Sequence, residues 1–440
     1  MDNKTLELVE KIRQQFDAGP YPRIPLERSP KEDVARLYIH NFTTAYYLRN
    51  RKVRETKGIT ILDAGCGSGY TSLTLAEANP GAKIVGVDLS EQSVELAKKR
   101  LQYHGFDNAE FYAMSIEELS TLKEEFDYIN AHEVLYLLPD PVAGLQAMKS
   151  VLAKDGIIRT NLHSAFQRAS FFRAQELFKT MGFMDNAPGE MEISLVRETM
   201  KALKDNVMLK AQNWKPNYET DDETLLANHL LQGDKGSTIP ELFSALRGAD
   251  LEFICMVNWQ QWQLMDLFKQ PDDLPLFLGI ALPELSLEEQ LHLYELFNPI
   301  HRLLDFWCGH PDQAEPFLPV AEWTDSDWQD AQVYLHPQLK TSVIKEELLR
   351  CIGQINPFQI SQQLKLGGQA VFLDSTIAAC LLPLWEEAQS MPSLMKRWQQ
   401  LRPVHPLTLE TTTELEAFEI LKGTLTHLES SGYALLEPSA

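Results

Sequence analysis

A run of alternate glycines follows a short apolar stretch early in the chain. Ile61-Leu62 leads into Asp63-Ala64-Gly65-Cys66-Gly67-Ser68-Gly69, and a helical pattern begins at Tyr70. Glycine lets a backbone turn sharply and approach a ligand closely, and the start of the following helix presents free N–H groups there. The spacing is GxGxG, which differs from the GxGxxG of dinucleotide sites. Asp63 would repel a pyrophosphate, whereas its carboxylate suits the ammonium group of an amino acid.

A second acidic residue stands about 20 residues beyond the glycines. Val85-Gly86-Val87-Asp88 reads as a strand that ends on the carboxylate of Asp88. In Rossmann-like sites a carboxylate at this place accepts both hydroxyls of a ribose. The two motifs together predict a site for a ligand that carries an amino acid part and a nucleoside part.

These motifs require a sheet whose strands all end at one edge. The pattern between residues 58 and 162 alternates short apolar strands with amphipathic helices, which is typical of an α/β fold with a doubly wound, mostly parallel sheet. Ser90 has the character of a helix N-cap. The expected strands are Thr60–Asp63, Lys83–Val87, Glu110–Ala113, Phe126–Asn130 and Gly156–Asn161, and the expected helices are 70–79, 90–105 and 141–153.

Taken in order, these features resemble class I S-adenosylmethionine-dependent methyltransferases over about residues 58–162. The resemblance implies S-adenosyl-L-methionine as cofactor, S-adenosyl-L-homocysteine as product, and no metal. Asp is common in the family where Ser115 stands, and many small-molecule members have His where Leu137 stands. The cofactor contacts that we expect are Asp63, Gly65, Cys66, Gly67, Gly69, Asp88, Leu89, Ser115, Ile116 and Asn130.

The acceptor is expected at the carboxyl end of the fourth strand, where Asn130, His132 and Glu133 stand. Methyl transfer needs alignment of the acceptor and, for some acceptors, removal of a proton. We predict His132 or Glu133 as the base and Asn130 as the group that orients the acceptor. Alternatively, Asn130 and Glu133 cap the next helix and line the cofactor, and His132 points to solvent. N-methylases of amides and amines carry Asn-Pro-Pro-Tyr here; only Asn130 matches, which favours nitrogen as the acceptor atom.

The N-terminal segment is expected to fold over the cofactor as a helical lid, residues 1–57. Residues 5–17 and 31–50 have helical patterns, and the proline-rich segment 19–25 between them must be extended. Ordinary packing of aromatic side chains is the alternative to a lid. The predicted lid contacts are Tyr21, Tyr38, His40 and Tyr46.

The chain beyond the sheet is expected to be largely α-helical. Its layout from about residue 222 is similar to the helical regions of bacterial protein methyltransferases, which include protein-lysine methylases. That similarity implies a protein substrate and a possible homodimer through the C-terminal helices. The final helix and strand are winged-helix-like. We predict helices within 165–212, 222–269 and 286–308, an irregular linker at 309–340, and helices over 341–440 that end on a strand at Tyr433–Glu437.

The predicted domains follow from these changes of pattern. They are a lid at 1–57, a methyltransferase domain at 58–220, a helical middle or regulatory domain at 221–320, and a C-terminal domain at 321–440.

The composition excludes several classes of protein. A net charge of −22 over 440 residues disfavours binding to nucleic acid or to an anionic membrane. No stretch of about 18 apolar residues is present, so no membrane span is expected. The five cysteines form no CxxC pair, which argues against a zinc site and is typical of a reducing cytoplasm.

Three functions are compatible with the sequence. The first is a protein N-methyltransferase acting on Lys or Asn, for which a phycobiliprotein asparagine is one candidate. The second is a small-molecule O- or N-methyltransferase. The third is a non-catalytic regulator that binds S-adenosylmethionine.

Overall fold

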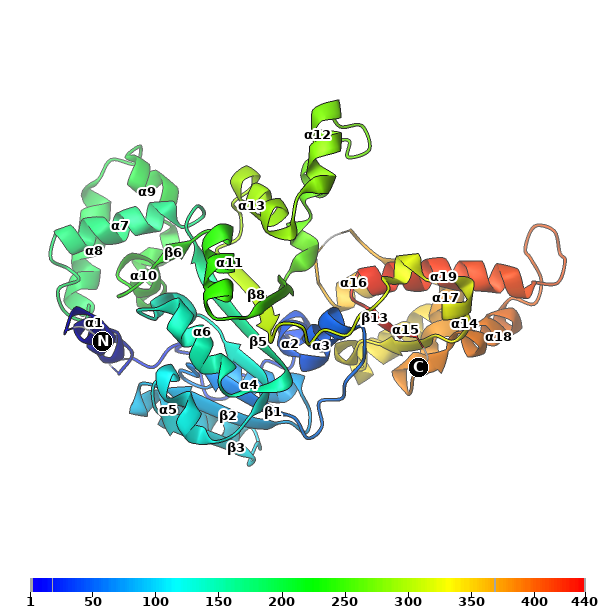
Figure 1. Ribbon diagram of the computed structural model, residues 1–440, viewed down its shortest axis with the longest axis horizontal. Helices are drawn as coiled ribbons and strands as arrows, with labels where there is room; N and C mark the ends of the chain where they lie inside the picture. Colours follow the sequence, from blue (N-terminus) through cyan, green and yellow to red (C-terminus); the bar gives the residue numbers. More distant parts are fainter. Residues whose placement is uncertain (1–2, 18, 368, 439–440) are drawn as a thin grey trace. The chain divides into compact units, whose positions relative to one another are not determined.

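The computed structural model of this chain describes residues 3–17, 19–367 and 369–438. The chain divides into two compact units, each made of separate stretches of sequence (Figure 1). The first unit comprises Met1–Ser29, Gly58–Ala76 and Gly81–Gln313. The second comprises Pro30–Lys57, Glu77–Pro80 and Ala314–Ala440.

An eight-stranded sheet forms the centre of the first unit, in the order β3-β2-β1-β4-β5-β8-β7 with β6 beside β5. Strands β1 to β6 pair in parallel, whereas β8 runs antiparallel to β5 and β7 antiparallel to β8. The predicted fold class is therefore confirmed. The strands are β1 (Thr60–Ala64), β2 (Lys83–Asp88), β3 (Ala109–Ala113), β4 (Phe126–Ala131), β5 (Leu152–Ser164), β6 (Gly236–Ser237), β7 (Glu252–Met256) and β8 (Leu303–Gly309).

Helices cover this sheet because its central strands are apolar on both faces. Helix α5 packs against β2 and β3, and α7 to α10 pack together around an apolar cluster of their own (Figure 1). The helices of the unit are α1 (Asn3–Asp17), α4 (Tyr70–Ala78), α5 (Glu91–Tyr103), α6 (Pro141–Lys149), α7 (Ala169–Thr180), α8 (Glu190–Ala202), α9 (Met208–Asn213), α10 (Asp222–His229), α11 (Ile239–Gly248), α12 (Leu276–Ala281) and α13 (Leu287–Phe297). Short 3₁₀ turns are η1 (Ile116–Leu122), η2 (Leu135–Leu137), η3 (Pro216–Glu219), η4 (Trp259–Trp262), η5 (Leu264–Leu267) and η6 (Leu282–Glu284).

The second unit is mainly helical and contains two small antiparallel sheets. The strand expected at the end of the chain is confirmed as β13, which pairs with β9. The sheets contain β9 (Gln332–Leu335), β10 (Phe358–Gln359), β11 (Phe372–Leu373), β12 (Gln389–Ser390) and β13 (Ala434–Glu437). The helices are α2 (Val34–His40), α3 (Phe42–Asn50), α14 (Asp325–Gln329), α15 (Ser342–Gly353), α16 (Ile360–Gln363), α17 (Ser375–Leu381), α18 (Met391–Leu401) and α19 (Glu414–Ser430), with 3₁₀ turns η7 (Val320–Glu322), η8 (Pro337–Leu339) and η9 (Leu382–Trp385).

The helix predicted over 31–50 is in fact two helices that meet at Asn41. The backbone of Asn41 is extended, and its side chain accepts a hydrogen bond from Thr43 N at 2.8 Å as the N-cap of α3. Asparagine favours such caps because its short side chain competes with helical backbone bonding. The local hydrogen bond therefore overrides a helical periodicity that continues through the break.

The helix predicted over 286–308 is wrong in its second half. Helix α13 ends at Phe297, and residues 303–309 form β8, which pairs with β5 and β7. Strand β7 also lies in a stretch that we expected to be helical, and β9 lies in the expected linker. A short apolar run that is buried in a sheet cannot be told from a buried helix by periodicity alone.

The two units also differ from the domain boundaries that the sequence suggested. The expected lid is shared between the units, because residues 1–29 fall in the first and 30–57 in the second. The expected middle domain joins the sheet through β6, β7 and β8. None of the helices in the described part of the chain has the length and apolar character that a bilayer crossing requires.

Candidate functional site

The glycine loop lies between β1 and α4 and leaves no room for a side chain at Gly67 or Gly69. Gly67 has a φ of +50°, and a Cβ there would lie 2.2 Å from the backbone oxygen of Tyr21. At Gly69, with a φ of +80°, a Cβ would lie 2.5 Å from Cα of Ala97 in α5. Both residues are thus glycine for steric as well as conformational reasons. The buried thiol of Cys66 has a pKa raised well above its usual range by burial and nearby carboxylates, so it is no nucleophile.

Asp63 ends β1 as a buried carboxylate within hydrogen-bond reach of α4 and β4. Ser72 Oγ donates to its Oδ2 at 2.6 Å, and Asn130 Nδ2 donates to its Oδ1 at 2.9 Å. Burial raises the pKa of Asp63 to about 6, although these hydrogen bonds and Arg159 lower it. The remaining oxygen of Asn130, Oδ1, is buried and has no hydrogen-bond partner.

An ammonium group fits this pair of side chains. Its charge offsets that of the Asp63 carboxylate, and one of its N–H groups satisfies Asn130 Oδ1. A buried acceptor without a donor is unfavourable by roughly 1–3 kcal/mol, so a ligand that donates there gains affinity. The amino acid part of S-adenosylmethionine has such a group.

Asp88 connects the end of β2 to the glycine loop. Its Oδ2 accepts from Gly67 N at 2.9 Å and its Oδ1 from Ser90 N at 2.9 Å. Ser90 in turn caps α5, as expected. Burial raises the pKa of Asp88, while these backbone bonds lower it. The carboxylate lies beside the loop, at the place predicted for a ribose contact, with Leu89 next to it in the chain.

The predicted adenine pair lies at the start of η1. Ile116 is buried in the core, and Ser115 Oγ donates to Glu117 Oε2 at 2.7 Å. The amide of Ser115 donates to Glu118 Oε2 at 3.0 Å. Contact of these residues with adenine stays a prediction.

The proline-rich segment 19–25, which we predicted to be extended, bends at Tyr21 and Pro22 and crosses the glycine loop as a strap. Ser68 donates from its N to Tyr21 O at 2.8 Å and from its Oγ to Pro22 O at 2.7 Å. Arg100, fully buried in α5, donates to Ile24 O at 2.7 Å, Pro25 O at 2.8 Å and Ser68 O at 2.9 Å. The strap is therefore held by four hydrogen bonds from Ser68 and Arg100, and a fifth ties Arg100 to the loop itself.

The four predicted lid residues fall in different units. Tyr21 lies on the strap of the first unit, where burial and the nearby Glu133 raise the pKa of its phenol. Tyr38, His40 and Tyr46 belong to the second unit. Tyr38 and His40 are buried, and the ring of Tyr38 lies 4.3 Å from that of His336. Packing within the second unit thus accounts for them, and their cofactor contact stays a prediction.

His132 and Glu133 follow β4 and share the amide of Asn161 on β5. Glu133 N donates to Asn161 Oδ1 at 3.0 Å, which orients the amide so that its Nδ2 donates to His132 Nδ1 at 2.8 Å. The neutral ring therefore carries its proton on Nε2. Burial and Arg159 lower the pKa of His132 to about 4. This arrangement favours His132 as a hydrogen-bond donor over the base role that we predicted.

Glu133 is equally constrained. It has a left-handed φ of +62°, and its carboxylate pairs with both terminal nitrogens of Arg302 and accepts from Tyr136 Oη at 2.7 Å. Burial alone would raise the pKa of Glu133, but its contacts with His163 and Arg302 hold it well below the usual range. Such a carboxylate is a poor base at neutral pH.

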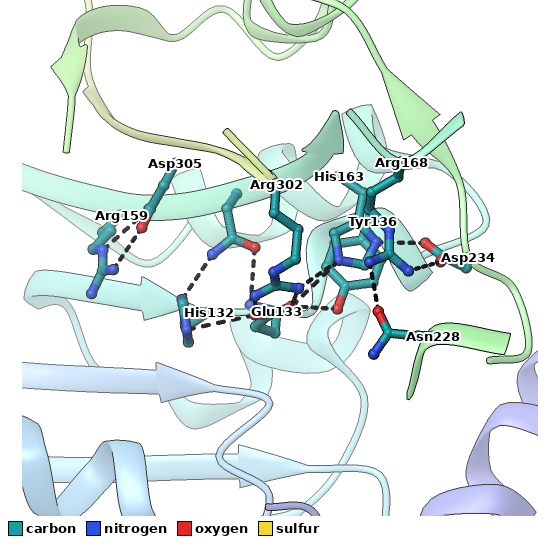
Figure 2. Close-up of polar contacts among 11 residues, drawn as sticks. His132, Glu133, Tyr136, Arg159, His163, Arg168, Asn228, Asp234, Arg302 and Asp305 are labelled. Atoms are coloured by element: carbon teal, nitrogen blue, oxygen red, sulfur yellow. Dashed lines mark hydrogen bonds and ion pairs between the residues drawn. The ribbon is translucent and has the colours of Figure 1, made fainter. Parts of the chain in front are cut away.

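A polar network that the sequence did not reveal lies beyond Glu133 (Figure 2). His163, at the end of β5, bonds through Nδ1 to Asp234 Oδ1 at 2.6 Å. Arg168 donates to Asp234 Oδ2 at 3.0 Å, and all three side chains are almost completely buried. Ligands bind at the carboxyl ends of the strands in such sheets, so the position of His163 at the end of β5 could have marked it as a site residue. Asp234 and Arg302 come from distant loops that carry no motif.

A buried ion pair extends the polar row across the sheet. Arg159, beside Asn130 in the strand register, donates to Asp305 of β8 at 2.7 and 3.2 Å. Within the ranges that the structure describes, no group of three or more His, Cys, Asp or Glu side chains is arranged to hold a metal ion. The site thus brings Asp63 with Asn130, the carboxylate of Asp88 and a dense polar network to the carboxyl ends of β1, β2, β4 and β5.

Residues 55–239 match a family model described as a methyltransferase domain. An uncharacterised protein of Synechococcus is 26% identical over 324 residues, which is 73% of this chain and 75% of that protein. The ubiquinone biosynthesis O-methyltransferase of Actinobacillus pleuropneumoniae is 32% identical over 113 residues, which is 24% of this chain and 47% of the relative. The chain thus spans three-quarters of the first relative and under half of the second.

Among solved structures, PKMT2 from Rickettsia typhi has the same fold. It aligns with a TM-score of 0.58 at 16% identity and covers 91% of this chain and 75% of that one. A second structure of PKMT2, in complex with AdoHcy, covers 90% of this chain with the same TM-score. The family model, the sheet topology and the glycine loop identify a class I S-adenosylmethionine-dependent methyltransferase domain in this chain.

Proposed function

We propose that this S-adenosylmethionine-dependent methyltransferase transfers the methyl group to a side-chain nitrogen of a protein, on Lys or Asn. The observation that carries the proposal is the extent of its fold similarity. The match to PKMT2 covers 91% of the chain, so it runs through the second unit as well as the sheet. A small acceptor needs only the sheet and its strap, whereas a second unit offers further surface to a macromolecule.

The overall charge of the chain supports a cationic acceptor. Glu133 and Asp234 are paired with Arg302 and Arg168 at the candidate site, but the whole chain carries a net charge of −22. A field of this sign attracts a lysine ammonium and repels phosphate and carboxylate groups. The acidic balance therefore supports lysine ahead of an anionic substrate.

The chain's own residues bind the cofactor, exclude water and place the acceptor. S-adenosylmethionine supplies, when bound, a methyl group on a positively charged sulfur. Asp63 and Asn130 would hold its ammonium group, Asp88 its ribose, and the strap would cover the loop. The acceptor would then lie at the ends of β4 and β5, near Glu133.

A small-molecule acceptor is the second candidate. It is favoured by the 32% identity to the ubiquinone biosynthesis O-methyltransferase, but that identity covers only 24% of this chain. A small-molecule acceptor would also leave the second unit without a role in the reaction. The third candidate, a non-catalytic regulator, would bind the cofactor without turnover.

Labelled methyl transfer separates the three functions. The full chain is incubated with S-adenosylmethionine carrying a tritiated methyl group and with an extract of cells that lack the gene. We expect label in the protein fraction, and acid hydrolysis of that fraction should yield N-methylated lysine or asparagine-derived methylamine. Label confined to low-mass products would contradict the protein acceptor, and an absence of label in both fractions would contradict catalysis.

A further inference from the structure

His163 lies at the carboxyl end of β5 in a constrained and almost completely buried position. Its Nδ1 lies 2.6 Å from Asp234 Oδ1. Its ring stacks on Tyr136 with 3.7 Å between centroids and an interplanar angle of 19°. The ring can therefore neither tilt nor flip without breaking both contacts.

The partners of the imidazole fix which nitrogen carries the proton. Asp234 accepts from Gln175 and Arg168 and stays ionised, because hydrogen bonds to His163 and charge lower its pKa against the effect of burial. A carboxylate only accepts, so Nδ1 of His163 must donate to it. On the other side, Arg302 Nη1 lies 3.0 Å from Nε2, and a guanidinium only donates. Nε2 thus carries a lone pair.

That lone pair lies beside Arg302 and Glu133, at the end of β4 where the acceptor is expected. Arg302 covers it, and the side chain of Arg302 is 45% exposed, whereas His163 is 1% exposed. Arg302 keeps two hydrogen bonds to Glu133 when its contact with Nε2 is lost. An incoming N–H group can therefore take the place of one donor without breaking the Arg302–Glu133 pair.

We propose that His163, oriented by Asp234, is the base that takes the proton from the methyl acceptor. This inference rests on the proposed methyl transfer to nitrogen. An N–H proton of the acceptor passes to Nε2, the lone pair that this leaves on nitrogen forms the bond to the methyl carbon, and the carbon–sulfur bond breaks with its electrons left on sulfur. The imidazolium lies between Asp234 and Glu133 Oε2, which is 3.6 Å from Nε2, and it returns the proton to solvent after product release.

The charged groups around the ring balance one another. Asp234 and Glu133 favour the imidazolium, whereas Arg168 and Arg302 oppose it, and Tyr136 donates its hydroxyl to Glu133. The proton gained by His163 is therefore held between two carboxylates.

The test is the substitution His163→Asn in the full chain. The amide of Asn can still donate to Asp234, but nothing replaces Nε2. The matched control is His292→Asn, because His292 bonds to Glu295 at 2.8 Å in a similar histidine–carboxylate pair on α13, away from the site. Both variants are assayed for AdoHcy binding and for single-turnover transfer of tritiated methyl to the protein fraction of an extract.

We expect His163→Asn to bind AdoHcy as the wild type does and to transfer methyl about 10²–10⁴-fold more slowly. His292→Asn should match the wild type. A folded His163→Asn that transfers at a rate within about threefold of the wild type would overturn the inference. If His163→Asn does not fold, Asp234→Asn is tested instead. A folded Asp234→Asn that transfers methyl at the wild-type rate would also overturn the inference.

Failure of the proposed function is distinguishable from failure of the role of His163 as the base. A wild-type chain that labels only low-mass products refutes the protein acceptor, and the same ratio between variants is then measured on those products. A wild-type chain that labels neither fraction refutes methyl transfer and the base together.

Discussion

Protonation of Asp63 should control the affinity for the cofactor. Burial raises the pKa of this carboxyl to about 6, and the ammonium group of the cofactor needs it ionised. A bound cation stabilises the ionised carboxylate, so the ligand lowers the pKa of Asp63. Binding of the ligand below about pH 6 therefore releases a proton. Affinity must therefore rise with pH and level off above about 7.

The magnitude follows from the ionised fraction. With a pKa of about 6, about nine-tenths of Asp63 is ionised at pH 7 and about one-tenth at pH 5. The dissociation constant should thus increase about tenfold between these values, or about 1.4 kcal/mol. Asp63→Asn should bind more weakly at pH 7 and lose most of this dependence.

AdoHcy is the suitable ligand for this measurement, because it has the ammonium group without the charged sulfur. Calorimetric titration of the full chain at pH 5, 6, 7 and 8 gives the affinity and the protons released. Asp88→Asn separates the contribution of the second carboxyl, which should leave the dependence on Asp63 in place. A wild-type affinity that stays constant from pH 5 to 7 would refute the assignment of Asp63 to the ammonium group.

Three substitutions test how the loop, the strap and the sheet are held. Gly67→Ala should weaken AdoHcy binding at least tenfold and lower the free energy of unfolding in urea by about 1–3 kcal/mol. Gly58→Ala is the control for backbone strain alone, because Gly58 has a φ of +84° and nothing within 4 Å of its added Cβ. Equal losses of stability in the two variants would show that the close approach at Gly67 is unimportant. Arg100→Gln removes the three carbonyl contacts and should increase proteolysis of the strap relative to the exposed Lys99→Gln, and an unchanged cleavage rate would argue against the clamp. Arg159→Met leaves the carboxylate of Asp305 unpaired and should lower the free energy of unfolding in urea by about 3–5 kcal/mol. A loss below about 1 kcal/mol would contradict a structural role for the ion pair.

The motifs that ligand chemistry requires were readable from the sequence. The alternate glycines, Asp63 and Asp88 all stand at strand ends where backbone turns and hydrogen bonds demand those residue types. The five parallel strands followed from alternation of apolar strands and amphipathic helices, whereas their order in the sheet did not. Local patterns of this kind are set by residues close in the chain.

The polar network beyond β4 was not readable. Asp234 approaches His163 because β6 pairs with the end of β5, and Arg302 reaches Glu133 because β8 lies beside β5. Both pairings depend on strands that periodicity could not distinguish from helices. Glu133 was found from its position, but its role changed once Arg302 and Tyr136 occupied its carboxylate.

The division of the N-terminal segment was also hidden. The strap and residues 30–57 look continuous in sequence, yet they belong to different units. Tyr38 packs against His336, a contact between residues almost 300 positions apart that no local pattern encodes.

The most direct test of the site is the affinity of the full chain for AdoHcy with and without the carboxylate of Asp88. Hydrogen bonds to a charged group contribute about 1.5–3 kcal/mol, so Asp88→Ala should weaken binding by about ten- to a hundredfold or more while the protein stays folded. Asp140→Ala, which removes an N-cap on the exposed start of α6, should leave the affinity unchanged. Equal affinities of the wild type and Asp88→Ala would show that the cofactor binds elsewhere.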